Sequence, residues 1–329
     1  MRLIRFFCAI ALTIFAIAQS SSQWVQTNGP YGGDVKALVV RTSGTAQHTL
    51  LAGTRGGGIF RSTDNGLTWA TSNTGLTELN VYSMAVCSTG TGTTDIFAGS
   101  YSEGTFRSTD DGITWTAANA GFTENPVLAI AAGPNGTGGR NLFAAQSGHG
   151  VFRSTDNGAS WIRVHAGLTD TNVTSLSMGT DATGGMCLLA GTWTGGVFRS
   201  TNDGSSWTAA NTGLTNTDVP ALLSCPNPAG GSDFYAGTYG SGVFRSTDYG
   251  LSWVAGNPAS QPGRMYSLAF RPNPAGGVWL YAGSTVGFYR SSDNGVTWTP
   301  SNLGLTDQHV VTLAVASAGA GSALLFAGT

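Results

Sequence analysis

Six tryptophans recur through the chain at an almost constant interval. Successive members lie 46, 46, 46, 46 and 45 residues apart; they are Trp69, Trp115, Trp161, Trp207, Trp253 and Trp298. Each closes nearly the same phrase, which reads Ser-Thr-Asp-Asn-Gly-Leu-Thr-Trp in the first copy and Ser-Ser-Asp-Asn-Gly-Val-Thr-Trp in the last. A fixed period of this size indicates one supersecondary unit repeated along the chain. Residues present in every copy are therefore expected to build the copy.

Each repeat contains four short segments with strand character, separated by turn residues. A first strand is predicted at residues 35–40, and a second, rich in small side chains, at 51–54. The third reads Gly-Val-Phe-Arg-Ser at 150–154, and the fourth begins at the repeated tryptophan, as at 115–118. This pattern predicts an all-β protein, a β-propeller built of four-stranded antiparallel blades.

The repeated phrase falls in the turn between the third and fourth strands. Its acidic residue is predicted to accept hydrogen bonds from nearby backbone N–H groups, and its glycine to supply a positive φ. The tryptophan is expected to pack between neighbouring blades. In the fourth copy Asn202 replaces the acid, so the position needs an acceptor oxygen and not a charge. We interpret the tryptophans and this position as structural; its members are Asp64, Asp110, Asp156, Asn202, Asp248 and Asp293.

These phrases resemble the Asp-box, also called the bacterial neuraminidase (BNR) repeat. That repeat occurs in the β-propellers of sialidases, xyloglucan-cleaving glucanases, sortilin-type receptors and photosystem II assembly factors. The resemblance covers the whole chain after its N-terminal segment and implies a propeller fold. It implies no single activity, because the family spans enzymes, receptors and assembly factors.

A partial repeat lies at each end of the six complete ones. Residues 23–27 contain Trp24, 45 residues before Trp69, and fit an isolated fourth strand. Residues 310–315 and 324–329 fit a first and a second strand. Together they predict a seventh blade closed by both ends of the chain, whose third strand is missing because the sequence is a fragment truncated at its C-terminus. The alternative is a six-bladed ring with frayed ends.

The first 18 residues have the pattern of a secretory signal peptide. Two arginines precede an apolar stretch too short to cross a membrane as a helix, so no transmembrane segment is expected. The sequence Ala-Ile-Ala at 16–18 predicts cleavage after Ala18, which leaves one propeller domain over residues 19–329. We therefore expect a protein that is secreted or held at the cell surface, in the periplasm or outside the cell.

The charge, cysteine and histidine content of the chain argues against several classes of partner and cofactor. With 15 basic and 17 acidic residues, the chain offers no positive field for nucleic acid. Three cysteines of the mature chain, Cys87, Cys187 and Cys225, have no spacing typical of a disulfide framework, although one pair could form. The four histidines are not spaced as metal ligands, so neither a metal nor a cofactor is expected.

The most enzyme-like residues do not form a recognisable catalytic site. An arginine recurs in every third strand and is predicted to brace its own blade, because equivalent residues of a ring cannot converge on one substrate; these are Arg61, Arg107, Arg153, Arg199, Arg245 and Arg290. Xyloglucan-cleaving relatives carry a catalytic acid in a Thr-Asp-x-Gly-Gly context. Here residues 54–58 read Thr-Arg-Gly-Gly-Gly, so Arg55 replaces that acid. We therefore predict no catalytic residue.

The turn after the second strand varies from repeat to repeat. Because the framework does not dictate its side chains, ligand binding is expected there; the candidates are Arg55, Tyr101, Glu103, His149, Trp193 and Tyr239. Trp193 and Tyr239, on adjacent blades, are predicted to form an aromatic platform. These residues favour a non-catalytic, monomeric propeller that binds a protein or a carbohydrate. The alternatives are a glycoside hydrolase, sialidase- or xyloglucanase-like, and a repeat module of a larger exported protein.

Overall fold

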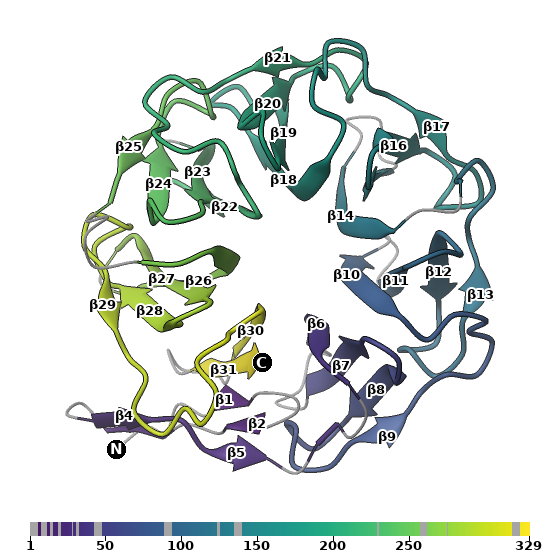
Figure 1. The fold of residues 1–329 in the computed structure, drawn as a ribbon, viewed down its shortest axis with the longest axis vertical. Coiled ribbons are helices and arrows are strands. Elements are labelled where there is room, and N and C mark those ends of the chain that lie inside the picture. The colour runs from purple at the N-terminus through teal and green to yellow at the C-terminus, as the bar shows by residue number, and fades with distance from the viewer. Residues whose placement is uncertain are drawn as a thin grey trace.

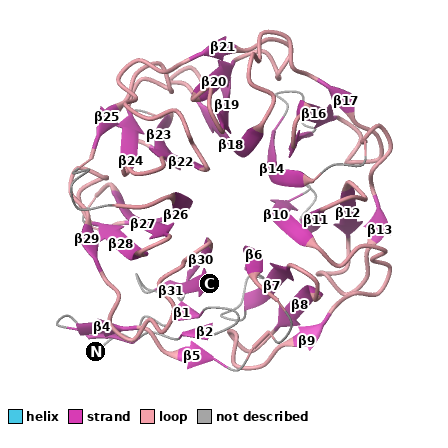
Figure 2. Cartoon of the chain, viewed as in Figure 1, coloured by secondary structure: helices cyan, strands magenta, loops and turns pink. Residues whose placement is uncertain are grey.

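The computed structural model describes residues 6–7, 12–13, 16–18, 21–27, 29–30, 33–42, 48–88, 94–123, 126–134, 140–228, 230–256, 262–274, 276–317 and 323–329. Six four-stranded sheets, blades 1 to 6, surround a central channel together with a partial seventh blade (Figure 1). Every regular element of the described residues is a strand, joined by loops and turns (Figure 2). The predicted all-β propeller is confirmed.

Strands follow one another in sequence order from the channel outward, and neighbours within blades 1 to 6 are antiparallel. The innermost strands are β6 (Val35–Thr42), β10 (Val81–Ser88), β14 (Val127–Pro134), β18 (Val173–Thr180), β22 (Ala221–Pro226) and β26 (Met265–Pro272). The second strands are β7 (His48–Thr54), β11 (Thr94–Ser100), β15 (Arg140–Gln146), β19 (Met186–Thr192), β23 (Ser232–Gly237) and β27 (Val278–Ser284). The third strands are β8 (Gly58–Ser62), β12 (Thr105–Ser108), β16 (Gly150–Ser154), β20 (Val197–Ser200), β24 (Val243–Ser246) and β28 (Gly287–Ser291). The outer strands are β9 (Ala70–Thr71), β13 (Thr116–Ala117), β17 (Ile162–Arg163), β21 (Thr208–Ala209), β25 (Val254–Ala255) and β29 (Thr299–Pro300).

Both ends of the chain contribute to blade 7. Its inner strands are β30 (Thr312–Ser317) and β31 (Ala323–Gly328), which pair antiparallel. The N-terminal segment supplies β1 (Phe6–Phe7), β2 (Leu12–Thr13) and β5 (Gln26–Thr27), whereas β3 (Ala16–Ala18) and β4 (Ser21–Gln23) form a separate two-stranded hairpin. β1 pairs with β31 in parallel, where the other blades have an antiparallel third strand, and β2 pairs with β5. The sequence pattern did not indicate β1, because this strand carries none of the repeated residues. The remaining positions of the predicted signal peptide lie outside the described residues.

Trp24 joins blade 7 to blade 6 in the way that other tryptophans join their blades. Its backbone N–H donates to the Leu303 carbonyl at 2.7 Å, and its indole N–H donates to the Ser301 carbonyl at 2.8 Å. In blade 2 the indole N–H of Trp115 donates to the carbonyl of Ser72, in blade 1, at 2.9 Å. The segment around Trp24 is therefore the outer strand of blade 7, as predicted.

The hydrophobic core lies between blades and not at the ring centre. One cluster combines Leu51 of blade 1 with Val81 and Trp115 of blade 2, and similar clusters follow around the ring. Second-strand glycines make this close approach possible, since a Cβ at Gly53 would lie 2.6 Å from a methyl carbon of Val81. The same contact closes the ring, where a Cβ at Gly328 would lie 2.8 Å from a methyl carbon of Val35.

The repeated turn is held by its own side chains. In blade 1, Asp64 accepts hydrogen bonds from the Ser62 hydroxyl at 2.7 Å and from the backbone N–H and hydroxyl of Thr68 at 2.9 and 2.5 Å. Two successive residues are left-handed, with φ of 57° at Asn65 and 81° at Gly66. Asparagine tolerates this conformation better than most residues, and glycine adopts it freely.

Asn202 shows how the turn is built without the carboxylate. Its Oδ1 accepts from the Ser200 hydroxyl and the Ser206 N–H, each at 2.9 Å, as an aspartate would. Its Nδ2 then donates to the Ser206 hydroxyl at 2.8 Å, so the last hydrogen bond is reversed in direction and kept.

Candidate ligand-binding face

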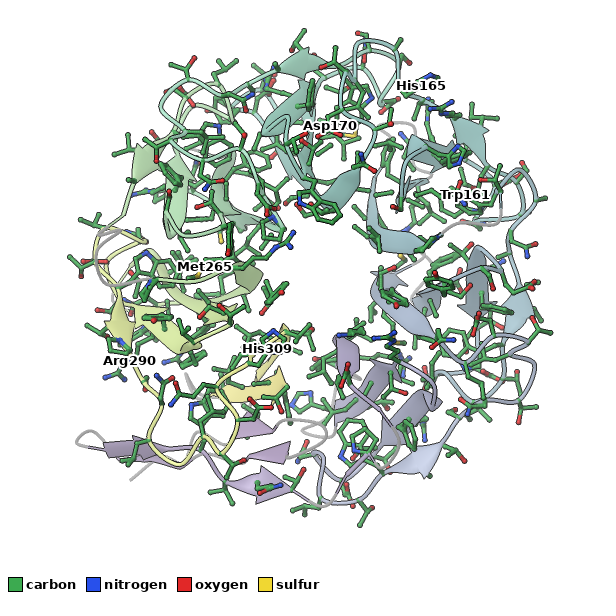
Figure 3. The ribbon with its side chains drawn as sticks, in the orientation of Figure 1. Trp161, His165, Asp170, Met265, Arg290 and His309 are labelled. Atoms are coloured by element: carbon green, nitrogen blue, oxygen red, sulfur yellow. The ribbon has the colours of Figure 1, made fainter. Side chains whose placement is uncertain are left out.

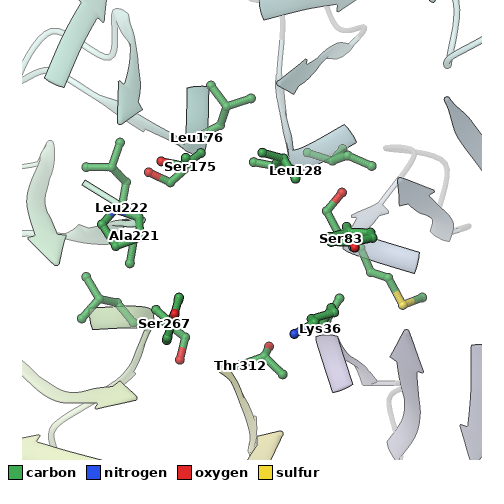
Figure 4. Close-up of a pocket in the computed structure, with 18 of the residues that line it drawn as sticks. Lys36, Ser83, Leu128, Ser175, Leu176, Ala221, Leu222, Ser267 and Thr312 are labelled. Atoms are coloured by element: carbon green, nitrogen blue, oxygen red, sulfur yellow. The ribbon is translucent and has the colours of Figure 1, made fainter. Parts of the chain in front are cut away.

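The innermost strands of all seven blades line a cavity of about 230 Å³ in the central channel (Figure 4). One lining position repeats every 46 residues around the complete ring, as Lys36, Tyr82, Leu128, Thr174, Pro220, Tyr266 and Thr312. Five of these seven side chains carry an amino or hydroxyl group and the other two are apolar, so the cavity can offer both hydrogen bonds and apolar contact.

Four of the six candidate residues stand beside one mouth of this channel. Arg55, Tyr101 and Trp193 each occupy the first position after a second strand, and Tyr239 occupies the second position after β23. Their backbone N–H groups donate, at 2.9 to 3.2 Å, to the carbonyl of a residue one to three positions before the innermost strand of the same blade. Tyr101 also contacts Tyr82, which lines the cavity, with ring centroids 5.8 Å apart.

Glu103 and His149 lie farther from the channel. Each occupies the third position of its turn, where its carbonyl accepts a hydrogen bond from a residue near the outer strand. Asn119 Nδ2 donates to Glu103 at 2.8 Å, and Arg163 Nε donates to His149 at 2.6 Å. The structure thus separates these two residues from the four at the mouth.

Large aromatic surfaces are exposed at the mouth. The exposed fraction is 51 % for Tyr101 and 56 % for both Trp193 and Tyr239. By contrast Trp115, like most of the repeated tryptophans, is only 2 % exposed. The two classes of aromatic residue therefore differ in environment as well as in position.

Trp193 belongs to a chain of side-chain contacts that involves three blades. The guanidinium of Arg264 (blade 6) lies 5.6 Å from the Trp193 ring centroid (blade 4) and 5.5 Å from that of Tyr266. Its Nη2 donates to Oδ1 of Asp218 (blade 5) at 3.0 Å. Tyr266 in turn meets the His309 ring edge-on at 5.3 Å, and Figure 3 places His309 toward the channel.

Sequence reasoning missed Arg264, although a signal for it exists. One position, repeated every 46 residues shortly before the innermost strand, holds Asp34, Asn80, Pro126, Asn172 and Asp218 in blades 1 to 5, and only blade 6 has a cation there. A positive charge at a position that is acidic or neutral in the other blades indicates that the fold does not require this side chain.

Carboxylates on this face are held by the fold. Glu78 accepts from the Asn80 N–H and the Ser102 hydroxyl, at 2.9 and 2.8 Å. Asp170 likewise accepts from the Thr194 N–H at 2.9 Å. Burial alone would raise the pKa of both groups, but these hydrogen bonds together lower it. Burial raises the pKa of Asp218, and the attraction of Arg264 opposes that effect only in part.

The repeated arginines lie at the other end of the third strands, near the repeated turns. Arg107 binds Asp95 of its own blade at 2.8 Å, as predicted. The prediction of own-blade bracing is wrong for Arg61 and Arg199, whose Nε atoms donate to backbone carbonyls of the next blade's turn. Their alkyl stems reach across because adjacent blades pack closely at this end.

Other candidate chemistry finds no support among the described residues. Cys87, Cys187 and Cys225 are buried free thiols, so no two of them are paired. No group of three or more His, Cys, Asp or Glu side chains gathers there as a metal site. Within the same part of the chain no helix is long and apolar enough to span a membrane.

Fold and channel mouth together define a β-propeller. No protein-family model matches the chain, and no curated protein sequence matches it. The extracellular domain of the putative hybrid two component system BT3049 from B. thetaiotaomicron is similar in fold, with a TM-score of 0.65 at 15 % identity over 91 % of this chain and 38 % of that one. The GH74 xyloglucanase from Xanthomonas campestris has a TM-score of 0.63 at 15 % identity, and the match covers 90 % of this chain and 54 % of that one. The GH74 enzyme from Niastella koreensis has a TM-score of 0.57 at 19 % identity, and the match covers 94 % of this chain and 46 % of that one. The chain thus spans between 38 % and 54 % of the length of these propeller proteins, and the similarity concerns the fold.

Proposed function

We propose that this protein is an exported, non-catalytic Asp-box propeller that binds a protein or a carbohydrate at the channel mouth. One observation carries the proposal: Tyr101, Trp193 and Tyr239 are each more than half exposed at equivalent positions beside the channel cavity. Exposed aromatic side chains next to a cavity with a few polar groups are typical of recognition sites.

The state of the carboxylates supports binding over hydrolysis. Glycoside hydrolysis needs two carboxyl groups facing each other, one of them protonated. Glu78 and Asp170 are instead hydrogen-bonded anions with lowered pKa values. Asp218 is ion-paired with Arg264, and Glu103 lies at the outer side of its turn.

The first experiment tests which face binds. Trp193→Ala, Tyr239→Ala and Tyr101→Ala are compared with Ile162→Ala, a matched control because Ile162 is 62 % exposed on an outer strand. In a screen of oligosaccharides and peptides, the first three variants should lose about tenfold or more in affinity, roughly 1.4 kcal/mol, while the control binds like the wild type. If all four variants bind like the wild type, the proposed site is wrong.

Glycoside hydrolysis is the second candidate, favoured by the fold similarity to two GH74 enzymes and by the raised pKa of Asp218 at the mouth. Sialyl and β-glucan oligosaccharides are the substrates to test. Hydrolysis that disappears in Asp218→Asn or Glu103→Gln would replace the binding proposal with an enzymatic one. We expect no turnover with any of them.

The proposed export signal, and the alternative role as a module of a larger protein, are tested on the secreted protein itself. If the signal peptide is cleaved as proposed, the mature N-terminus is Gln19, directly after Ala18, and the mature protein lacks β1, β2 and β3. N-terminal sequencing checks this, and the intact mass of the secreted product tests the alternative role as a module of a larger protein. A mature chain that retains residues 1–18 would contradict the proposed export signal.

A further inference from the structure

We infer, on the basis of the proposed binding function, that blades 4, 5 and 6 form a subsite for one neutral sugar ring. Trp193 provides the stacking surface, and Arg264 is a positioning residue that holds its indole. Trp193, Asp218 and Arg264 come from three different blades, so the subsite exists only in the assembled ring.

The geometry leaves the indole both fixed and accessible. Arg264 contacts the Trp193 ring at 5.6 Å, yet more than half of Trp193 is exposed. Arg264 is itself held by the ion pair with Asp218 at 3.0 Å and by the Tyr266 ring at 5.5 Å. An aromatic ring restrained in this way can stack with a ligand at little cost in conformational entropy.

Charge favours a neutral ligand. The cation that contacts the Trp193 ring, Arg264, is neutralised by Asp218 at 3.0 Å. An anionic ligand would have to compete with Asp218 for the guanidinium, and a cationic ligand would meet the guanidinium itself. Sugar hydroxyls can hydrogen-bond to either member of the ion pair without breaking it.

The surroundings of Trp193 favour a sugar over a protein surface. A stable protein interface buries about 800 Å² on each partner around an apolar centre. Here each exposed ring is followed in the chain by small residues, Trp193 by Thr194 and Gly195, and Tyr239 by Gly240 and Ser241. Small polar neighbours leave room for the hydroxyl edge of a ring stacked on the indole.

Calorimetric titration tests the ligand class. The probes are cellohexaose, xylohexaose, maltohexaose and laminarihexaose, an oligogalacturonate of equal length, and a peptide panel. We expect one or more neutral hexamers to bind, with an affinity unchanged when salt is raised from about 0.1 M to about 1 M, which shortens the Debye length from about 10 Å to about 3 Å. Trp193→Ala should weaken that binding about tenfold, an effect of roughly 1.4 kcal/mol, and Ile162→Ala should not.

Other outcomes would reject the neutral-sugar subsite alone, or the subsite together with the proposed binding function. Preference for the oligogalacturonate, or absence of binding by every neutral hexamer, rejects the neutral-sugar subsite. Binding of peptides alone, sensitive to Trp193→Ala, rejects the subsite while the proposed binding function stands. If ligands bind but no aromatic variant at the mouth affects them, both proposals fail.

The positioning role of Arg264 has a readout that needs no ligand. In Arg264→Gln, fluorescence anisotropy decay should show faster motion of Trp193, with the Trp193→Phe variant identifying its contribution, and sugar affinity should fall severalfold. Arg264→Lys retains the charge and should recover part of both. Arg163→Gln is the control, because Arg163 bonds the outer side of a turn. Unchanged Trp193 motion together with unchanged affinity in Arg264→Gln would refute the role.

Discussion

Replacing Asp110 separates the hydrogen-bonding role of the repeated turn from its charge. Asp110 accepts four hydrogen bonds, from the Ser108 hydroxyl at 2.8 Å, the Ile113 N–H at 3.1 Å, and the Thr114 N–H and hydroxyl at 2.9 and 2.6 Å. A buried hydrogen bond contributes about 1 kcal/mol, and half of that is appropriate for this solvent-accessible turn. Asp110→Ala should therefore lower the free energy of unfolding by about 2 kcal/mol, or about 3 °C in the thermal midpoint.

Asp110→Asn should cost much less, about 0.5 kcal/mol, because an amide can reproduce the hydrogen bonds that Asn202 makes. Denaturant unfolding of both variants beside the wild type measures the two differences. A loss in Asp110→Asn as large as in Asp110→Ala would refute the reasoning, since it would mean that the turn needs the carboxylate charge.

The same pair of variants has a predicted pH dependence. Burial alone would raise the pKa of Asp110, but the hydrogen bonds from Thr114 and Ser108 outweigh it and lower the pKa from 3.8 to about 2. A carboxyl group with a depressed folded-state pKa stabilises the fold above its unfolded value, and this contribution is lost as pH falls through the folded value. The stability difference between wild type and Asp110→Asn should therefore shrink between about pH 4 and about pH 2. A difference that stays constant over this range would contradict the assignment.

Three further perturbations test other parts of the ring. Trp24→Ala should destabilise the protein by about 3 to 5 kcal/mol by removing a buried indole at the ring closure, and a loss below about 1 kcal/mol would show that the ring does not depend on it. Gly75→Ala should lower the free energy of unfolding by at least about 2 kcal/mol, because φ is +90° and the added Cβ would collide with the Trp115 carbonyl. Gly56→Ala is the control: φ is +96° but the space around it is open, so this variant should cost only the backbone strain. Burial raises the pKa of Cys87 to about 12, so its thiol should resist alkylation near about pH 8 until the protein unfolds, and rapid labelling of the native protein would contradict its buried position.

Most of the framework could be predicted because its causes lie within one repeat. The turn from Ser62 to Trp69 is held by bonds between residues two to four positions apart. Repetition at a 46-residue period then predicts every other blade, and Trp24, 45 residues before Trp69, predicts the outer strand of blade 7. The inner strands of that blade follow from the same pattern.

The candidate face could be predicted only as a set of variable positions. Glu103 belongs to the same turn as Tyr101, and His149 to the equivalent turn of blade 3, and a sequence cannot say which position of a short turn lies toward the channel. Backbone hydrogen bonds made on folding decide this, since the first turn position continues the ladder beside the innermost strand.

What the sequence determined by itself is the blade, whose strands and turn depend on contacts between neighbouring residues. The tertiary structure alone decided how blades combine. It placed β1 beside β31, and it brought Arg264 to Trp193, 71 positions away and two blades apart, through an acid of the blade between them. These contacts form between residues of different blades, where small second-strand residues pack against the next blade, and no single repeat contains both partners.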